Sequence, residues 1–239
     1  MKNLVLPLLV FGCFAAAAFG QSDATARLRH VFPQVADGRF EDGSGYITSF
    51  TITNITGIHA FCSIDLVGLG QDRLFGSSVT IPPGGFALIS TRNAAAFDHG
   101  YGVVSCSEWV TATATYGLVR DSGQRLGMAT VFSSQAAASG QLVVVQGDGT
   151  RTGLALVNDS PFTQRYTIQL FGQTGNRIDT RSLTVGPGGH ISSFVDELVS
   201  VPSGAFIGSL SISSVGGFHA IGVFFDGAVF TTVPVTVFF

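Results

Sequence analysis

Residues 54–85, NITGIHAFCSIDLVGLGQDRLFGSSVTIPPGG, align without a gap with residues 158–189, NDSPFTQRYTIQLFGQTGNRIDTRSLTVGPGG, 104 positions further along the chain. The two stretches share the residues at matched positions Asn54/Asn158, Ile64/Ile168, Leu66/Leu170, Gly68/Gly172, Arg73/Arg177, Thr80/Thr184 and Pro83-Gly84-Gly85/Pro187-Gly188-Gly189. This period is too long for a solenoid and suits tandem domains. The repeat therefore predicts two copies of one folding unit.

The match continues on both sides of these stretches with changes of offset. At the offset of 104 it includes Gly45/Gly149, Thr48/Thr152, Gly100/Gly204 and Ser105/Ser209. Beyond Ser105 the offset grows to 108, which matches Val110 with Phe218. It then falls to 102, which matches Thr130 with Thr232. We expect the changes of offset to lie in turns, because strands are kept while loops vary in length.

Within each copy the pattern is that of β-strands. Apolar and polar residues alternate, as in Tyr166-Thr-Ile-Gln-Leu-Phe171, and turn residues recur at short, regular intervals. This spacing predicts an all-β fold of two tandem Ig-like antiparallel β-sandwich domains related by an internal repeat. We assign the first sandwich to residues 30–132, a small-residue linker to 133–140 and the second sandwich to 141–239. A single helical turn capped by Ser193 is expected in the second copy.

The beginning of the chain predicts an export signal. Lys2 precedes an apolar run over residues 4–19, and Ala18-Phe19-Gly20 has the small-x-small pattern of a signal-peptidase site. We therefore assign residues 1–20 to a signal peptide and residues 21–29 to an N-terminal linker. The run is short for a membrane span, so no span is expected after cleavage. The mature protein is expected to be extracellular, at the cell surface or in the periplasm.

Two cysteines remain when the predicted signal, which contains Cys13, is removed. Alternation places Cys62 and Cys106 on core-facing positions, and at the offset of 104 their counterparts, Tyr166 and Leu210, are of core type. An oxidising compartment permits a disulfide between Cys62 and Cys106, with two buried thiols as the alternative. Lipid attachment at Cys13 is the alternative to complete removal of the signal.

The composition excludes several classes of protein. The chain has 239 residues, of which 46% are hydrophobic and 11% charged, and its formal net charge is −3. These values exclude a disordered protein and give no electrostatic footprint for nucleic acid. Lys2 is the only lysine, so the mature chain would have none. Because lysine protects sheet edges, we expect edges open to self-association or to strand addition with a partner.

The sequence contains no convincing catalytic arrangement. No two of the histidines stand at metal-ligand spacing; they are His30, His59, His99, His190 and His219. Asp37, Glu41 and Asp42 crowd one loop and form a weak calcium candidate. Their spacing does not match an EF-hand loop, so a turn-forming role is favoured. We expect no enzyme activity, no cofactor and no metal.

Two further motifs have both a functional and a structural interpretation. Asn54-Ile-Thr56 and Asn158-Asp-Ser160 are glycosylation sequons, but their matched positions favour turns in which these side chains bond local backbone. Trp109 could stack on a sugar, as in carbohydrate-binding modules. Because one tryptophan does not make an aromatic platform, we expect Trp109 and most phenylalanines to be buried between the sheets.

The second copy resembles the repeats of secreted bacterial proteins built from tandem Ig-like β-sandwiches. In those repeats an N-x-S strand end, a P-G-G turn, a D-E-L turn and a closing F-T-T-L-P-V strand recur. The residues that match are Leu156-Val-Asn158, Leu170-Phe-Gly172, Gly186-Pro-Gly-Gly189, Phe194-Val-Asp-Glu-Leu198, Gly208-Ser-Leu-Ser-Ile-Ser-Ser214 and Phe230-Thr-Thr-Val-Pro-Val235. The first copy matches more weakly, with Arg92-Asn93-Ala94 in place of the D-E-L turn. The resemblance implies an Ig-like fold and export but assigns no activity.

Together these observations predict a non-catalytic exported module with a structural, adhesive or binding role, and with a protein or glycan as its partner. One alternative is an outer-membrane β-barrel, which needs girdles of Tyr and Trp, whereas the chain has four Tyr and one Trp. The other alternative is a carbohydrate-binding module, which requires exposed aromatic residues gathered in one place.

Overall fold

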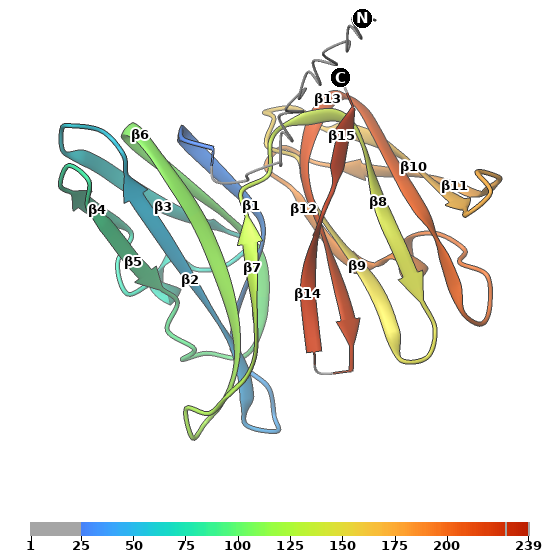
Figure 1. Ribbon diagram of the computed structural model, residues 1–239, viewed down its shortest axis with the longest axis horizontal. Helices are drawn as coiled ribbons and strands as arrows, with labels where there is room; N and C mark the ends of the chain where they lie inside the picture. Colours follow the sequence, from blue (N-terminus) through green and yellow to red (C-terminus); the bar gives the residue numbers. More distant parts are fainter. Residues whose placement is uncertain (1–24, 228, 239) are drawn as a thin grey trace, which may run out of the picture.

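The computed structural model describes residues 25–227 and 229–238, which are mostly β-strand with very little helix (Figure 1). The predicted signal peptide, residues 1–20, lies outside the described residues. The N-terminal half consists of β1 (Arg27–Arg39), β2 (Ser44–Asn54), β3 (Ala60–Val67), η1 (Gln71–Arg73), β4 (Ser78–Ile81), β5 (Phe86–Ser90), β6 (Asp98–Arg120) and β7 (Arg125–Phe132). The C-terminal half consists of β8 (Ala137–Gln146), β9 (Thr150–Val157), β10 (Gln164–Gly172), β11 (Arg177–Val185), β12 (His190–Phe194), α1 (Val195–Leu198), β13 (Phe206–Asp226), β14 (Val229–Pro234) and β15 (Thr236–Phe238).

Each half is an antiparallel sandwich in which one long strand belongs to both layers. In the N-terminal half, β6 pairs with β3 through its first part and with β2 and β7 through its second. In the C-terminal half, β13 pairs first with β10 and β8, and then with β9 and β14. Alternating residues of both layers fill the space between them. The predicted all-β sandwich fold is confirmed.

The strand registers show which residues of the two halves correspond. Asn54 lies opposite Val110, and one step along the matching pair of strands Val157 lies opposite His219. The offset is therefore 104 between β2 and β9 and 108 between the second parts of β6 and β13, as the sequence predicts. Similarly, Thr113 lies opposite Phe132 and Ile221 opposite Pro234, which gives the predicted offset of 102 for β7 and β14.

One part of the predicted alignment is shifted by four residues. Leu66 lies opposite Gly102 but Leu170 lies opposite Leu210, so the offset of 108 already holds at the start of β6. Gly100 therefore corresponds to Gly208 and not to Gly204. A side chain at Gly100 would collide with the carbonyl oxygen of Val67, and one at Gly208 with that of Phe171.

The same shift corrects two other matches. Ser209 is not the counterpart of Ser105, and Cys106 corresponds to Ser214 instead of Leu210. The four additional residues lie between β12 and β13, in the segment that contains α1. This helical turn begins at Val195 with Phe194 as its N-cap, so capping by Ser193 is wrong. The Glu197 carboxylate accepts the N–H of Phe194 at 3.1 Å, while Ser193 pairs within the sheet.

Strands extend into both predicted linkers. β1 begins at Arg27, and Arg29 pairs with Ser105, so part of the segment 21–29 belongs to the first sandwich. β8 begins at Ala137 within the segment 133–140. The link between the halves is accordingly shorter than the sequence predicts.

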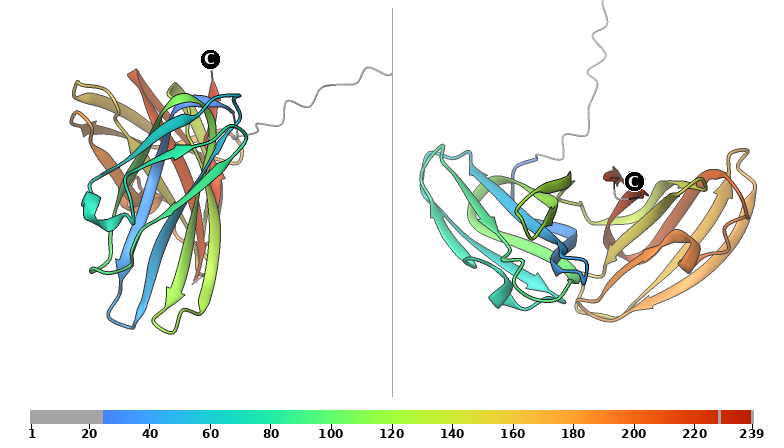
Figure 2. Two further views of the ribbon diagram at one scale, coloured as in Figure 1. Left: turned by 90° about the vertical axis from the view of Figure 1, so that its left-hand side faces the viewer. Right: turned by 90° about the horizontal axis from the view of Figure 1, so that it is seen from below.

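The two halves share buried surface. Ala155, Ile221, Val223 and Phe230 of the C-terminal half belong to the same buried cluster as the core of the N-terminal half. A second junction cluster combines Val157 with residues of β1 and β6. The C-terminal half has a separate core of its own. Seen from below, the halves meet at an angle along this junction (Figure 2, right).

The predicted disulfide is confirmed. Cys62 on β3 and Cys106 on β6 lie directly opposite one another and are bonded. Cys62 is fully buried, and Cys106 is partly buried against the same core. A structural disulfide is typical of an oxidising, non-cytoplasmic compartment.

Candidate functional site

An apolar cavity lies at the junction of the two halves. Its volume is about 420 Å³, and its lining is mostly apolar. β1, β2 and β6 contribute from one side, and β9, β12, α1, β13 and β14 contribute from the other. Cavities of this size and character hold small organic ligands.

Aromatic rings from both halves form a continuous series along the cavity. Consecutive ring centroids are separated by 4.5 Å (Phe40–Phe97), 5.8 Å (Phe97–Tyr46), 5.6 Å (Tyr46–Phe230), 6.0 Å (Phe230–Phe225) and 5.4 Å (Phe225–Phe194). These are stacked, tilted and edge-on distances at which aromatic pairs attract. The rings thus provide a rigid apolar wall that neither half could form alone.

Strand geometry explains how these rings converge. Phe225 and Phe230 lie directly opposite one another on β13 and β14, and alternation turns Val223 to the same face as Phe225. Phe40 follows the end of β1, and Phe97 precedes β6. The adjacent ends of β1 and β6 therefore bring these two rings together.

The charged groups beside the cavity contact one another. Glu197 lies 3.2 Å from the guanidinium of Arg151, which also bonds Asp196 at 2.8 Å. The same guanidinium lies over the Phe194 ring, 3.6 Å from its centroid. One guanidinium and two carboxylates leave this group with a net negative charge, which repels an anionic ligand. The apolar lining in turn disfavours a cation, which would lose its water there, so the cavity favours an uncharged ligand.

Uncharged polar groups supply the remaining lining. Burial raises the pKa of the Tyr46 and Tyr116 hydroxyls, so both remain protonated donors. Tyr116 donates to the backbone carbonyl of Gln34. The side-chain Oε1 of Gln34 is buried and has no hydrogen-bond partner among the described residues. Gln34 therefore offers an acceptor at the edge of a largely apolar cavity.

No protein-family model matches the chain, and no curated protein matches it either. None of the helices in the described ranges is long and apolar enough to cross a membrane.

The junction also brings together histidines that the sequence shows only as isolated residues. His99 of the N-terminal half and His190 of the C-terminal half have ring centroids 5.7 Å apart. Burial, with the charge of His99 as a smaller cause, lowers the pKa of His190 to about 4. Burial also lowers the pKa of His219, whose Nε2 lies 3.8 Å from Asp159. His190 is thus neutral at neutral pH.

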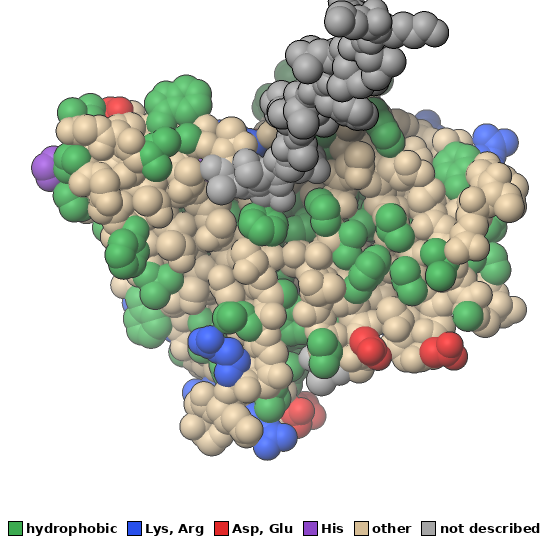
Figure 3. Space-filling view, in the orientation of Figure 1, with side chains coloured by type: hydrophobic (Ala, Val, Ile, Leu, Met, Phe, Trp, Pro, Cys, Tyr) green, Lys and Arg blue, Asp and Glu red, His purple; other side chains and the backbone are tan. Residues whose placement is uncertain are grey.

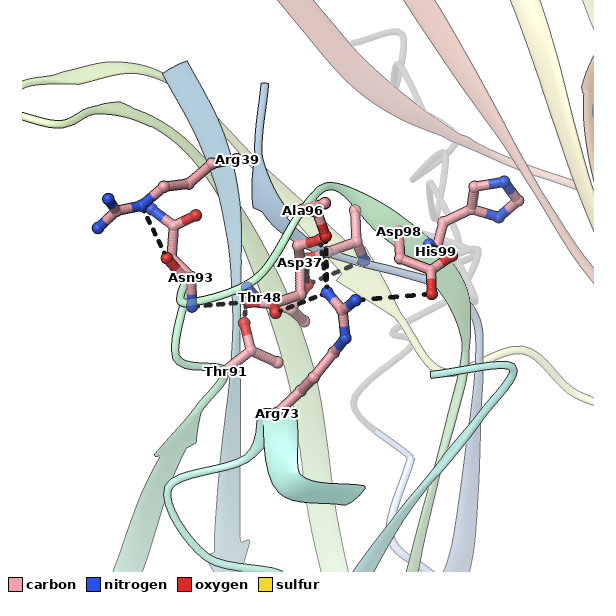
Figure 4. Close-up of polar contacts among 10 residues, drawn as sticks. Asp37, Arg39, Thr48, Arg73, Thr91, Asn93, Ala96, Asp98 and His99 are labelled. Carbon is pink, nitrogen blue, oxygen red and sulfur yellow. Dashed lines mark hydrogen bonds and ion pairs between the residues drawn. The ribbon is translucent and has the colours of Figure 1, made fainter. Parts of the chain in front are cut away.

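The three residues of the calcium candidate have separate surroundings, and Figure 4 shows those of Asp37. Asp37 is fully buried, where its carboxylate accepts from Arg73 at 3.2 Å and from the N–H of Asn93 at 3.0 Å. Asp42 instead accepts from the N–H and the hydroxyl of Ser44 within its turn. Glu41 is exposed. Residues 25–227 and 229–238 contain no group of three or more His, Cys, Asp or Glu side chains placed to hold a metal.

The two sequon asparagines form identical structural corners. The Nδ2 of buried Asn54 donates to the carbonyls of Ile58, Ile81 and Pro82 at 2.7, 3.1 and 3.1 Å. The Nδ2 of buried Asn158 donates to the carbonyls of Phe162, Val185 and Gly186 at 2.7, 3.0 and 2.8 Å. The three acceptors of the second corner stand 104 residues after those of the first. The structural interpretation of both motifs is confirmed.

The expected burial of Trp109 is wrong, because 55% of this residue is exposed. Trp109 precedes buried Val110 on β6, so strand alternation turns it to the outer face of the layer. Several phenylalanines are also more than half exposed, namely Phe61, Phe75, Phe86 and Phe162. The periodicity of the sequence predicts on which side of a strand a side chain lies, but not whether another part of the protein covers that side.

Proposed function

We propose that this protein is a non-catalytic binding module that acts outside the cytoplasm and holds a small, uncharged, largely apolar ligand in the junction cavity. The observation that supports this most strongly is the series of aromatic rings, from Phe40 to Phe194, that both halves contribute to one cavity. Flat rings present large apolar area at little entropic cost, which favours a planar ligand.

The export that we propose rests on two features. The sequence predicts a signal peptide over residues 1–20, and the Cys62–Cys106 disulfide is typical of an oxidising compartment. Between them they support an extracellular, cell-surface or periplasmic location for the mature chain.

Binding can be measured with N-phenyl-1-naphthylamine, a neutral planar probe that fluoresces in apolar surroundings. Ser192 lines the cavity on edge strand β12, so Ser192→Trp adds bulk to the cavity. Ser182, exposed on β11, provides the matched control Ser182→Trp. We expect saturable binding by the parent protein and by Ser182→Trp, and an affinity lower by about tenfold or more in Ser192→Trp.

Equal affinity in the two variants would contradict the proposed site. The absence of saturable binding by the parent protein would contradict the proposed ligand class. Thermal unfolding of both variants establishes that they are folded at the temperature of the titration.

A further inference from the structure

The outer face of the layer β5-β2-β6-β7 is a regular array of uncharged side chains. Strand register aligns these side chains in rows, which are Phe86–Thr53–Thr111, Leu88–Thr51–Thr113–Phe132 and Ser90–Ser49–Thr115–Thr130. We call these residues the threonine face. Trp109 extends it at one end, two residues before Thr111 on β6.

The threonine face has apolar edges and a hydroxyl centre. Phe86 and Leu88 on β5 are 72% and 62% exposed, and Phe132 is exposed at the opposite edge on β7. None of the positions in the three rows is charged. In the space-filling view few red and blue side chains are visible, and most of what is seen is coloured green or tan (Figure 3).

The corresponding face of the C-terminal half is covered by protein, and its residues differ from those of the threonine face. The residues equivalent to Thr51, Thr53, Thr113 and Thr115 are Ala155, Val157, Ile221 and Val223, all buried at the junction. Threonine at all four positions keeps the centre of the N-terminal face hydrated. This substitution pattern argues against permanent coverage by protein.

A second copy of the chain does not offer a free surface like the one that covers the equivalent face of the C-terminal half. The covered face of the C-terminal half packs against the N-terminal half, on the side of its sandwich between β1 and β7. In the C-terminal half, β15 pairs with β8 on that side, and Val235 is buried there. We therefore do not expect a second copy of the chain to cover the threonine face.

We infer that the threonine face, together with Trp109, binds a neutral polysaccharide. Neighbouring strands place hydroxyls about 4.8 Å apart, and alternate residues of a strand place them about 6.6 Å apart, so a flat chain of sugars meets donors and acceptors along its length. The aromatic rings at the end and edge of the array can pack on the apolar faces of sugar rings. A face without cations offers nothing to an anionic chain, and this selects for a neutral one.

The experiment is retention of the full-length mature protein on insoluble cellulose, chitin, curdlan and mannan, with polygalacturonate as the anionic comparison. We expect retention on at least one neutral polymer and none on polygalacturonate. Trp109→Ala should weaken that retention by about tenfold, and Thr113→Lys should weaken it further because it places an uncompensated charge at the centre of the face. The matched control is Phe162→Ala, which removes an exposed ring from the C-terminal half.

Trp109 is the only tryptophan in the chain, so its emission reports directly on this face. A soluble oligosaccharide of the retained polymer should shift the emission to shorter wavelength, whereas N-phenyl-1-naphthylamine bound at the junction should leave its wavelength unchanged. Retention on none of the four neutral polymers would overturn the inference. Retention that Thr113→Lys and Trp109→Ala leave unchanged in folded protein, or retention on polygalacturonate, would also overturn it.

Discussion

The two halves present equivalent faces to different surroundings. On the C-terminal half, Ile221 and Val223 lie beneath the N-terminal half and join its core. On the N-terminal half, the equivalent residues Thr113 and Thr115 lie on the open threonine face. The strands pair in the same way in both halves, and the faces differ in whether the other half covers them.

This difference shows how one strand pattern serves two purposes. A threonine keeps the β-branched shape that strands favour and adds a hydroxyl that water can solvate. An isoleucine or valine at the same place gains from burial, at about 25 cal/mol per Å² of apolar surface. Threonine at these positions thus accompanies an open face, and isoleucine or valine accompanies a covered one.

The largest effect is expected from a charge on the covered face. Ile221→Lys would bury an ammonium group at the junction, and we expect a loss of about 3 to 4 kcal/mol in the free energy of unfolding. The matched change Thr113→Lys should cost less than about 0.5 kcal/mol, because the lysine remains in water. Urea denaturation of both variants measures the difference. Equal costs would mean that the faces are equally covered.

An intermediate effect is expected from acid, because the covered face carries His190 and His219 where the threonine face carries Phe86 and Thr111. Burial lowers the pKa of His190 from 6.5 to about 4, so the unfolded chain binds its proton more readily. The stabilisation is therefore complete above pH 6.5 and is lost as the pH falls toward 4, with a slope of up to about 1.4 kcal/mol per pH unit.

The pH dependence is measured by urea denaturation between pH 7 and pH 4. His190→Gln should flatten the dependence, while His59→Gln, at an exposed position, should leave it unchanged. A parent protein whose stability is constant over this range, or an unaltered slope in His190→Gln, would be inconsistent with a buried neutral His190.

The smallest effect is expected from making the open face resemble the covered one. Thr113→Ile adds apolar surface that stays in contact with water, so the free energy of unfolding should change by less than about 0.5 kcal/mol. Self-association at high concentration should increase, because the exposed apolar patch becomes larger. Sedimentation velocity and urea denaturation check both expectations. A gain of more than about 1 kcal/mol would show that Thr113 is covered in the native protein.

Much of the fold follows from local signals in the sequence. Alternation identifies the strands, Cys62 and Cys106 lie on paired strands as expected, and the offset of 108 at Val110 agrees with the register. The alignment of the sequence places the matches of Gly100 and Ser105 four residues too early. Glycine and serine recur so often near β13 that identity alone does not locate the insertion around α1.

The site itself depends on how the halves are arranged, which local patterns do not encode. His99 and His190 meet only because the halves dock, and nothing in their separate surroundings in the sequence signals this. Trp109 lies on the outer side of its strand as alternation requires. Its exposure depends on the absence of a covering half, so its burial was predicted incorrectly. A contrast that the sequence does contain is the threonine at positions 51, 53, 113 and 115 against aliphatic residues in the second copy.

Thiol labelling tests the central claim, that equivalent faces of the two halves are respectively open and covered. Thr113→Cys and Ile221→Cys each add one thiol to the mature protein, which lacks Cys13 and in which Cys62 and Cys106 are bonded. Because position 113 is partly exposed, we predict that its thiol reacts with Ellman's reagent in native protein within about tenfold of its rate in urea. The thiol at position 221 should react about a hundredfold more slowly until the protein unfolds. Equal native rates at the two positions would contradict the account.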